Sequence, residues 1–406
     1  MSHTHLYVLL AGLCVFAHCH HTFERREDHD SDPPSLKIAP GNTGFAFKLY
    51  HQLASEHPHN NIFFSPLSIS TAFAMLSLGA ASTTLSELLS GLGFNQADLS
   101  EQEIHEGFRH LFQMLNNLDG EIHLSIGNAL FTDDQVHLLD KFLDDAKTFY
   151  ETEVLPTNFK NPEEAESQIN SYIEKKTDGN IVNIYKKPDT EAVMVLVSYI
   201  FLKAFWETPF NSQNTKENDF FVDEQTTVTV PMMKKDSFLE FYQDEDLSCK
   251  VVKLPYKGNA SALFILPDQG KMEHLEDALN EDVLLKWMNS LQPRRIQLFL
   301  PKFSVSGSYS IKGLLRKMGI TDVFTDRADL SGFTGNPDLK VSKAFHEAVL
   351  NVHEAGTEAA AATAVEAVGR RMRPTVMFNM PFLVLIFHDI TNSILFMGRV
   401  VNPREQ

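Results

Sequence analysis

Apolar residues recur with helical spacing through the first half of this chain. Phe45, Leu49 and Leu53 repeat at every fourth position, which predicts an amphipathic helix. Ser65 followed by Pro66 predicts a second helix, because serine caps an amino end well and proline suits the first turn. Two further helical segments are predicted, one with an apolar face at Ile104, Phe108, Leu111, Phe112 and Leu115 and one from Pro162 to about Gly179.

From about residue 193 the pattern changes to that of strands. The run 193–201 is apolar except for Ser198, as in a strand covered on both faces. No repeat, polar linker or change of composition divides the chain, so we expect one α+β domain with most helices early and most strands late. Further strands are predicted at 228–230, 251–254, 263–266, 296–300, 348–352, 376–387 and 394–401, with helices near 275–291 and 310–318.

The amino end has the features of a secretory signal. The apolar run at 6–17 is too short to span a bilayer, and the small residues Ala17 and Cys19 suit cleavage by signal peptidase. We therefore expect residues 1–19 to be removed and the product to be secreted. The polar, charged stretch 20–40 is expected to be a disordered tail ahead of a single domain at 41–406.

Composition and cysteine usage narrow the function classes. The 53 acidic residues exceed the 35 basic ones, and the formal net charge of −18 argues against a nucleic-acid or anionic-membrane partner. Cys14 and Cys19 would leave with the signal, so no internal disulfide is expected. Cys249 is expected to be a buried or half-buried thiol, with a site for pairing to another chain as the alternative. The chain has no P-loop, dinucleotide fingerprint, nucleophile elbow or zinc-ligand spacing, so we expect no enzyme, cofactor or metal site.

One stretch differs from the rest of the chain. Residues 354–371 read EAGTEAAAATAVEAVGRR, mostly small side chains that end at two arginines. An alanine-rich run would ordinarily predict a helix, but strands are predicted on both sides, at 348–352 and 375–379. We interpret the stretch as a tether between two strands, in which Arg370 and Arg371 suit the primary pocket of a trypsin-like protease.

Several short motifs follow one another along the chain. They lie at 61–68 (NIFFSPLS), 170–173, 176–181, 205–206 (FW), 329–332 (DLSG), 346 (H), 378–382 (FNMPF) and 396–403. Each motif is weak alone, but together, in order and spacing, they resemble the serpin family, and within it the antitrypsin-like secreted members. The resemblance covers the chain from about Phe45 to Pro403.

The resemblance implies a fold of three β-sheets with about nine helices and an exposed reactive loop at about 354–374. In this family a serine protease cleaves the loop and becomes attached as an acyl-enzyme. The loop then inserts as a new strand into the large central sheet, which releases stored strain. The chain is therefore expected to be a monomeric, secreted inhibitor that forms a covalent 1:1 complex with trypsin-like serine proteases.

The residue sizes in the loop suit insertion. Thr357, Ala359, Ala361 and Thr363 share one strand parity and are all small, so an inserting strand would place neither charge nor bulk in the core. The hinge that the resemblance implies comprises Glu354, Gly356, Thr357, Ala359, Ala360, Ala361, Ala362 and Thr363.

Family spacing places the cleaved bond at Arg370–Arg371, whether counted from Thr357 or back from Phe378. An arginine there would pair with an aspartate at the base of a trypsin-like primary pocket. Cleavage after Arg371 or Arg373 is the alternative, since Arg370 and Arg373 also match a minimal convertase site. Both alternatives would lengthen the inserting segment.

Other positions match the region where the sheet opens: Ser65, Ser68, Ser198, Trp206, Lys302 and His346. Lys302 and Glu354 match an ion pair at the end of the sheet, with an ordinary surface pair as the alternative. Trp206 matches the place where the loop first enters, with a plain core aromatic as the alternative. At Ser198 the family usually has asparagine, and the shorter side chain leaves open whether it reaches His346 or whether a water bridges the two.

Asn259 begins the sequon Asn-Ala-Ser and is the expected glycosylation site. Residues 101–117 contain only Arg109 where heparin-binding relatives are basic, so heparin is not expected as a partner.

Two other functions stay open. One is a non-inhibitory carrier that binds a small molecule such as a hormone, and the other is a member that is simply cleaved as a substrate.

Overall fold

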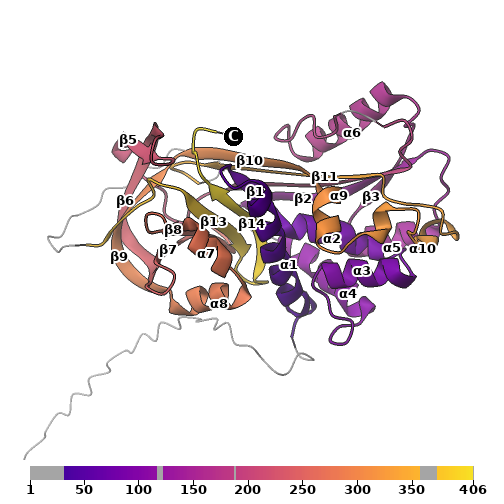
Figure 1. Ribbon diagram of the computed structural model, residues 1–406, viewed down its shortest axis with the longest axis horizontal. Helices are drawn as coiled ribbons and strands as arrows, with labels where there is room; N and C mark the ends of the chain where they lie inside the picture. The colour runs from indigo at the N-terminus through magenta and orange to yellow at the C-terminus, as the bar shows by residue number, and fades with distance from the viewer. Residues whose placement is uncertain (1–31, 117–121, 187–188, 357–372, 406) are drawn as a thin grey trace, which may run out of the picture.

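The computed structural model describes residues 32–116, 122–186, 189–356 and 373–405. The predicted signal peptide, residues 20–31 of the tail and the loop segment 357–372 lie outside the described residues. The rest forms helices packed against two hydrogen-bonded sheets (Figure 1), which confirms the α+β class.

The helices of the described part lie mainly in the first half of the chain, as the apolar spacing predicts. They are α1 (Pro34–Glu56), α2 (Pro66–Ser77), α3 (Ser82–Gly91), α4 (Glu101–Asn116), α5 (Asp140–Tyr150), α6 (Pro162–Lys176), α7 (Met272–Ala278), α8 (Glu281–Ser290), α9 (Ile311–Lys317) and α10 (Ser331–Thr334).

The predicted tail boundary was wrong at its carboxyl end. Residues 34–40 belong to α1 and are not a disordered extension. Pro34 opens this helix, where the missing amide hydrogen costs nothing. Ile38 and Ala39 are buried against the core. Packing of these two apolar side chains therefore extends the helix through a segment whose polar composition predicted disorder.

The five-stranded sheet has the strand order β10-β11-β4-β2-β3. All of its neighbouring pairs are antiparallel except β4–β11 and β2–β3. Its strands are β2 (Ile122–Asp133), β3 (Glu153–Thr157), β4 (Met194–Ala204), β10 (Phe303–Ser310) and β11 (Lys343–Val352).

The nine-stranded sheet has the order β1-β14-β13-β8-β7-β6-β9-β12, with β5 also paired to β6. The strand β6 is 18 residues long and pairs with β9 and, near its end, with β7. Because β6 pairs with both β7 and β9, two of the three sheets that the resemblance implies form one continuous hydrogen-bonded sheet. Its strands are β1 (Ile62–Phe64), β5 (Lys216–Phe221), β6 (Thr227–Asp244), β7 (Cys249–Pro255), β8 (Ala260–Pro267), β9 (Gln292–Pro301), β12 (Thr375–Met377), β13 (Phe382–His388) and β14 (Ser393–Val400).

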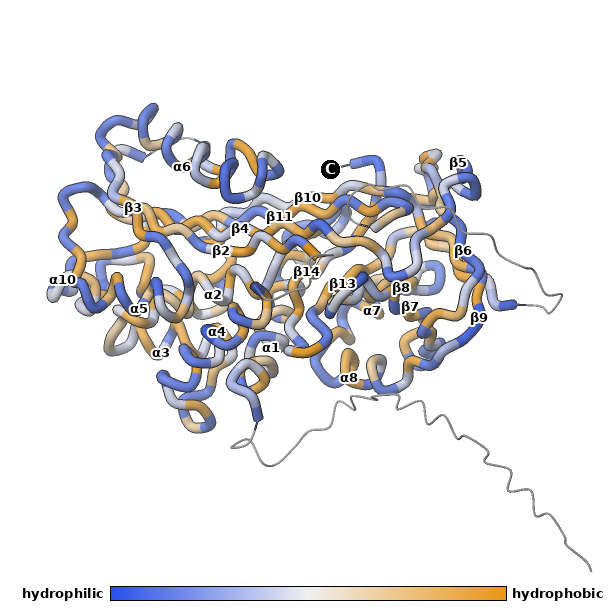
Figure 2. The backbone as a smooth tube through the Cα atoms, turned by 180° about the vertical axis from the view of Figure 1, so that it is seen from behind, coloured by the Kyte–Doolittle hydropathy of each residue, from blue (hydrophilic) through white to orange (hydrophobic). Residues whose placement is uncertain are grey.

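In Figure 1, α6 lies over part of one face of the five-stranded sheet, and α1 to α5 lie on the opposite side. Val195 and Val197 of β4 pack with Ile169 and Ile173 of α6. The alternate residues of β4 pack into the main core, as the period of a strand requires. In Figure 2, apolar stretches concentrate in the strands and hydrophilic ones in the outer turns. This two-sided burial explains why 193–201 is apolar except for Ser198.

Candidate functional site

The boundary between β4 and β11 is the place where the resemblance puts sheet opening. The two strands run parallel and pair from Lys343↔Val195 to Val349↔Phe201. Their outer neighbours β2 and β10 run antiparallel to them. A strand placed between β4 and β11 and directed opposite to both would therefore form an antiparallel ladder on each side.

The segment expected to form the reactive loop begins at a tight turn, residues 353–356, at the carboxyl end of β11. The amide of Trp206 donates a hydrogen bond of 2.8 Å to the Ala355 carbonyl. Gly356 has a φ of +151°, and a side-chain carbon there would overlap the carbonyl oxygen of Ala204. The turn therefore requires glycine, and it holds the start of the loop against the end of β4.

The indole of Trp206 lies against the same turn. It is buried and stacks on Tyr256 with the ring centroids 4.3 Å apart. Its Nε1 donates a hydrogen bond of 3.0 Å to the His353 carbonyl. Trp206 is therefore a buried core aromatic that also contacts the turn, and its role in loop entry stays a prediction.

Within this turn, the carboxylate of Glu354 has two side-chain partners. Its Oε2 lies 2.9 Å from Lys302 Nζ, and Thr215 Oγ1 donates to its Oε1 at 2.8 Å. Burial by itself would raise the pKa of the Glu354 carboxyl, but the hydrogen bonds from Lys302 and Thr215 outweigh burial and hold that pKa below its usual value. Because the Glu354 side chain is only 16% exposed, this pair is better shielded than an ordinary surface pair.

A row of polar residues crosses the middle of the sheet. Asn128 on β2, Ser198 on β4 and His346 on β11 occupy paired positions. Ser198 Oγ donates to Ser68 Oγ at 2.9 Å and lies 3.3 Å from His346 Nδ1. Since Ser68 belongs to α2, the row connects that helix to both strands of the boundary. The serine reaches the histidine directly, so no bridging water is required.

His346 is a neutral hydrogen-bonding residue in the folded protein. The amide of Ser65 donates to its Nε2 at 2.9 Å. An amide can only donate, so the ring proton lies on Nδ1, which faces Ser68 Oγ and Ser198 Oγ at 3.3 Å each. Burial lowers the pKa of His346 to about 3, because the charged ring would lose its hydration.

Stability should consequently fall as the pH drops below about 6.5, the usual histidine pKa, because His346 then gains a proton in the unfolded chain but not in the folded one. The loss is about 1.4 kcal/mol per pH unit until the pH approaches the folded-state pKa. Denaturant unfolding between pH 7 and 5 should show a smaller loss for His346→Asn than for the natural protein. His137→Asn, at an exposed position, is the control. Equal losses for the natural protein and His346→Asn would contradict the prediction.

Three of the residues that shape this region were not identified from the sequence. Asn128 directly precedes the apolar run at 129–131, which is only a weak signal, because His123 and Ser125 nearby are polar as well. Thr215 pairs with Glu354, and Asp236 on β6 pairs with Arg373. Neither residue carries a local signal, because its partner is distant in the sequence. The predicted loop residues Thr357, Ala359, Ala360, Ala361, Ala362, Thr363, Arg370 and Arg371 lie outside the described residues.

Two other predicted positions are described. Cys249 is buried, as expected, and burial raises the pKa of its thiol to about 12. Asn259 is exposed in the turn between β7 and β8. Among the residues that the structure describes, no helix is long and apolar enough to cross a bilayer. The same residues contain no cluster of three or more His, Cys, Asp or Glu side chains that could hold a metal ion.

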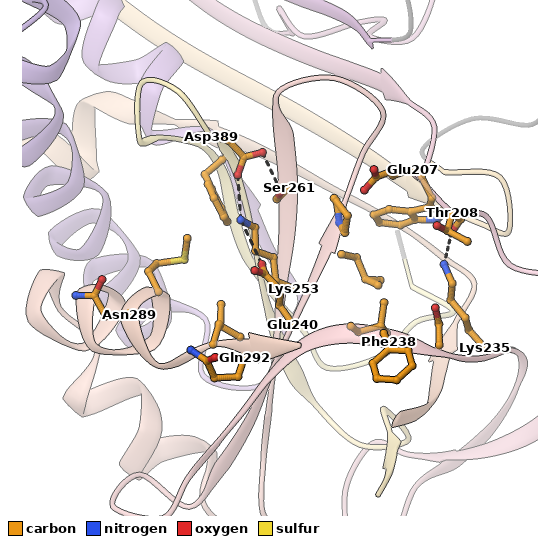
Figure 3. Close-up of a pocket in the computed structure, with 18 of the residues that line it drawn as sticks. Glu207, Thr208, Lys235, Phe238, Glu240, Lys253, Ser261, Asn289, Gln292 and Asp389 are labelled. Carbon is orange, nitrogen blue, oxygen red and sulfur yellow. Dashed lines mark hydrogen bonds and ion pairs between the residues drawn. The ribbon is translucent and has the colours of Figure 1, made fainter. Parts of the chain in front are cut away.

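A pocket of about 560 Å³ lies between the end of α8 and the strands β6 and β7 (Figure 3). Lys253 crosses it and pairs with Asp389 at 3.2 Å and Glu240 at 3.5 Å. Phe238 at its margin is 70% exposed. The pocket therefore offers both apolar and charged surface to a ligand.

Comparison with known proteins identifies the family of proteins to which this fold belongs. A family model described as Serpin (serine protease inhibitor) matches residues 40–403. The chain therefore belongs to the serpin family, and the fold that the resemblance implied is confirmed.

Individual relatives agree with that assignment. An alpha-1-antitrypsin-like protein of Tamias sibiricus is 48% identical over 384 residues, which cover 94% of this chain and 93% of the relative. The crystal structure of human glycosylated kallistatin superposes with a TM-score of 0.88 at 46% identity, over 92% of this chain and 100% of that one. Human thyroxine-binding globulin complexed with thyroxine gives a TM-score of 0.88 at 44% identity, over 92% and 100%.

Proposed function

We propose that this protein is a secreted suicide inhibitor of trypsin-like serine proteases. The protease cleaves Arg370–Arg371 and becomes an acyl-enzyme on Arg370. The freed loop then inserts between β4 and β11 and carries the attached protease with it. The product is a covalent 1:1 complex in which the protease is displaced from its original position.

The parallel pairing of β4 with β11 is the observation that carries this proposal. The chain reverses at 353–356 on leaving β11, so the following residues would run antiparallel to both strands. Residues 357–369 outnumber the ten residues of β11, which is enough for a full-length strand. The small side chains of one parity in this segment add to the argument.

The charge of the bait supports a trypsin-like target. Arginine forms a charge-assisted, bidentate contact with a carboxylate, which an apolar primary pocket cannot supply. The secretory signal and the glycan at Asn259 belong to the same proposal, because they place the inhibitor among extracellular proteases.

Incubation with trypsin tests the proposal. We expect a species with the combined mass of inhibitor and protease that survives boiling in detergent, because the bond between them is covalent. Complete cleavage of the chain with no such species would reject the inhibitor function and leave a simple substrate.

A carrier function is the second candidate, supported by the 560 Å³ pocket and by the thyroxine-bound relative. Trp206 lines this pocket, so thyroxine bound there should quench its fluorescence. Saturable quenching without any covalent trypsin complex would favour the carrier over the inhibitor.

A further inference from the structure

The far end of the reactive loop is fixed to the nine-stranded sheet. The Gln297 amide donates a hydrogen bond of 2.9 Å to the Pro374 carbonyl. From Thr375 onward, β12 pairs in register with β9. Backbone hydrogen bonds therefore hold the chain from Pro374, only four residues after Arg370.

Asp236 adds a side-chain anchor immediately before that point. It lies opposite Gln297 in the β6–β9 ladder. Its Oδ1 accepts from Arg295 Nε at 3.0 Å, and its Oδ2 pairs with the Arg373 guanidinium. Both Asp236 and Arg373 are only 13% exposed. One carboxylate thus separates two guanidinium groups, and its removal would leave like charges facing each other in a poorly hydrated place.

This anchor limits which arginine a protease can use. A trypsin-like primary pocket has to enclose the whole arginine side chain, with its guanidinium on a carboxylate of the protease. Arg373 cannot enter such a pocket while it is paired with Asp236. The bond after Arg373 also leads to a proline, whose nitrogen carries no hydrogen.

The anchor also distinguishes the two remaining bonds. An extended substrate contacts its protease on both sides of the cleaved bond. Cleavage after Arg371 leaves only Met372 between the bond and the fixed Arg373. Cleavage after Arg370 places two residues, Arg371 and Met372, between the bond and the fixed Arg373, and the longer connection is easier to fit to the protease cleft.

We propose that Asp236 is a specificity-determining residue that acts through Arg373. By holding Arg373 against β6 and β9, it removes this arginine as a bait and directs cleavage to Arg370–Arg371 rather than to Arg371–Met372. The inference rests on the proposed function, because it concerns the register in which a protease meets the reactive loop.

Short digestion with trypsin, followed by mass spectrometry of the carboxyl-terminal fragment, tests the role of Asp236. The natural protein should release mainly a fragment that begins at Arg371. In Asp236→Asn the share that begins at Met372 should rise severalfold, and more inhibitor should be consumed for each protease inactivated. Asp236→Glu keeps the carboxylate and should restore the natural ratio. Glu240→Gln is the matched control, since Glu240 lies on the same strand but pairs with Lys253 at 3.5 Å.

Arg373→Gln supplies an independent variant in case Asp236→Asn lowers the thermal stability. It leaves the Asp236–Arg295 pair intact and should shift the fragments in the same direction. Unchanged fragment ratios in both folded variants would overturn the proposal, as would a natural protein cut mainly after Arg371. Absence of any covalent complex would instead reject the inhibitor function, while the fragment ratios would still report on the anchor.

Discussion

Arg370→Glu should slow formation of the covalent complex with trypsin by more than an order of magnitude while leaving the protein folded. The change places a carboxylate against the aspartate of the primary pocket, in place of a guanidinium. Losing one partner of a buried charge pair costs about 2–5 kcal/mol, which slows complex formation by about thirtyfold to several thousandfold. The measurement is the second-order rate of trypsin inactivation, together with the yield of the detergent-stable complex.

Two variants separate the bait from its neighbour. Arg370→Lys keeps the positive charge and should still form the complex, only more slowly, because an ammonium group lacks the bidentate geometry. Arg371→Glu leaves the bait in place and should reduce the rate less than Arg370→Glu. If Arg371→Glu had the larger effect, the bond after Arg371 would be the reactive one.

Ala361→Arg should convert the inhibitor into a substrate. Position 361 has the strand parity that an inserted loop would turn toward the core. Burying an unpaired guanidinium there costs several kcal/mol, so insertion should stall while the acyl-enzyme hydrolyses. Trypsin should cleave the variant completely, with little covalent complex. Cleavage should also fail to raise its thermal unfolding temperature, whereas the cleaved natural protein should become more stable.

Ala360→Arg is the matched control for insertion. It carries the same side chain one residue earlier, where the opposite parity would turn it away from the core. This variant should retain most of the covalent complex and the gain in stability on cleavage. Equal behaviour of the two variants would show that the loop does not insert as a regular strand.

The short motifs were enough for the family. They could not reveal most of the five-stranded sheet, because only β4 has a strongly apolar pattern and only the end of β11, residues 348–352, was predicted as a strand. In β10 the apolar residues alternate with serines and a glycine, a weak signal that was not recognised as a strand. β2 was missed as well. In α1, burial of Ile38 and Ala39 outweighed the polar composition around them.

The amino-acid sequence alone shows that the loop residues of one strand parity are small and that arginines stand at 370 and 371. It also shows that the expected mature chain has a single cysteine. These properties are local, so they can be read without the folded structure. Contacts between distant segments required the folded protein. Folding brings His346 to within reach of Ser198, Thr215 to Glu354, and Asp236 to Arg373. These pairs are separated by more than a hundred residues, and only the pairing of strands and helices sets their geometry. The sequence therefore leaves Arg371 and Arg373 open as alternatives to Arg370, whereas the folded sheet already holds Arg373 against Asp236.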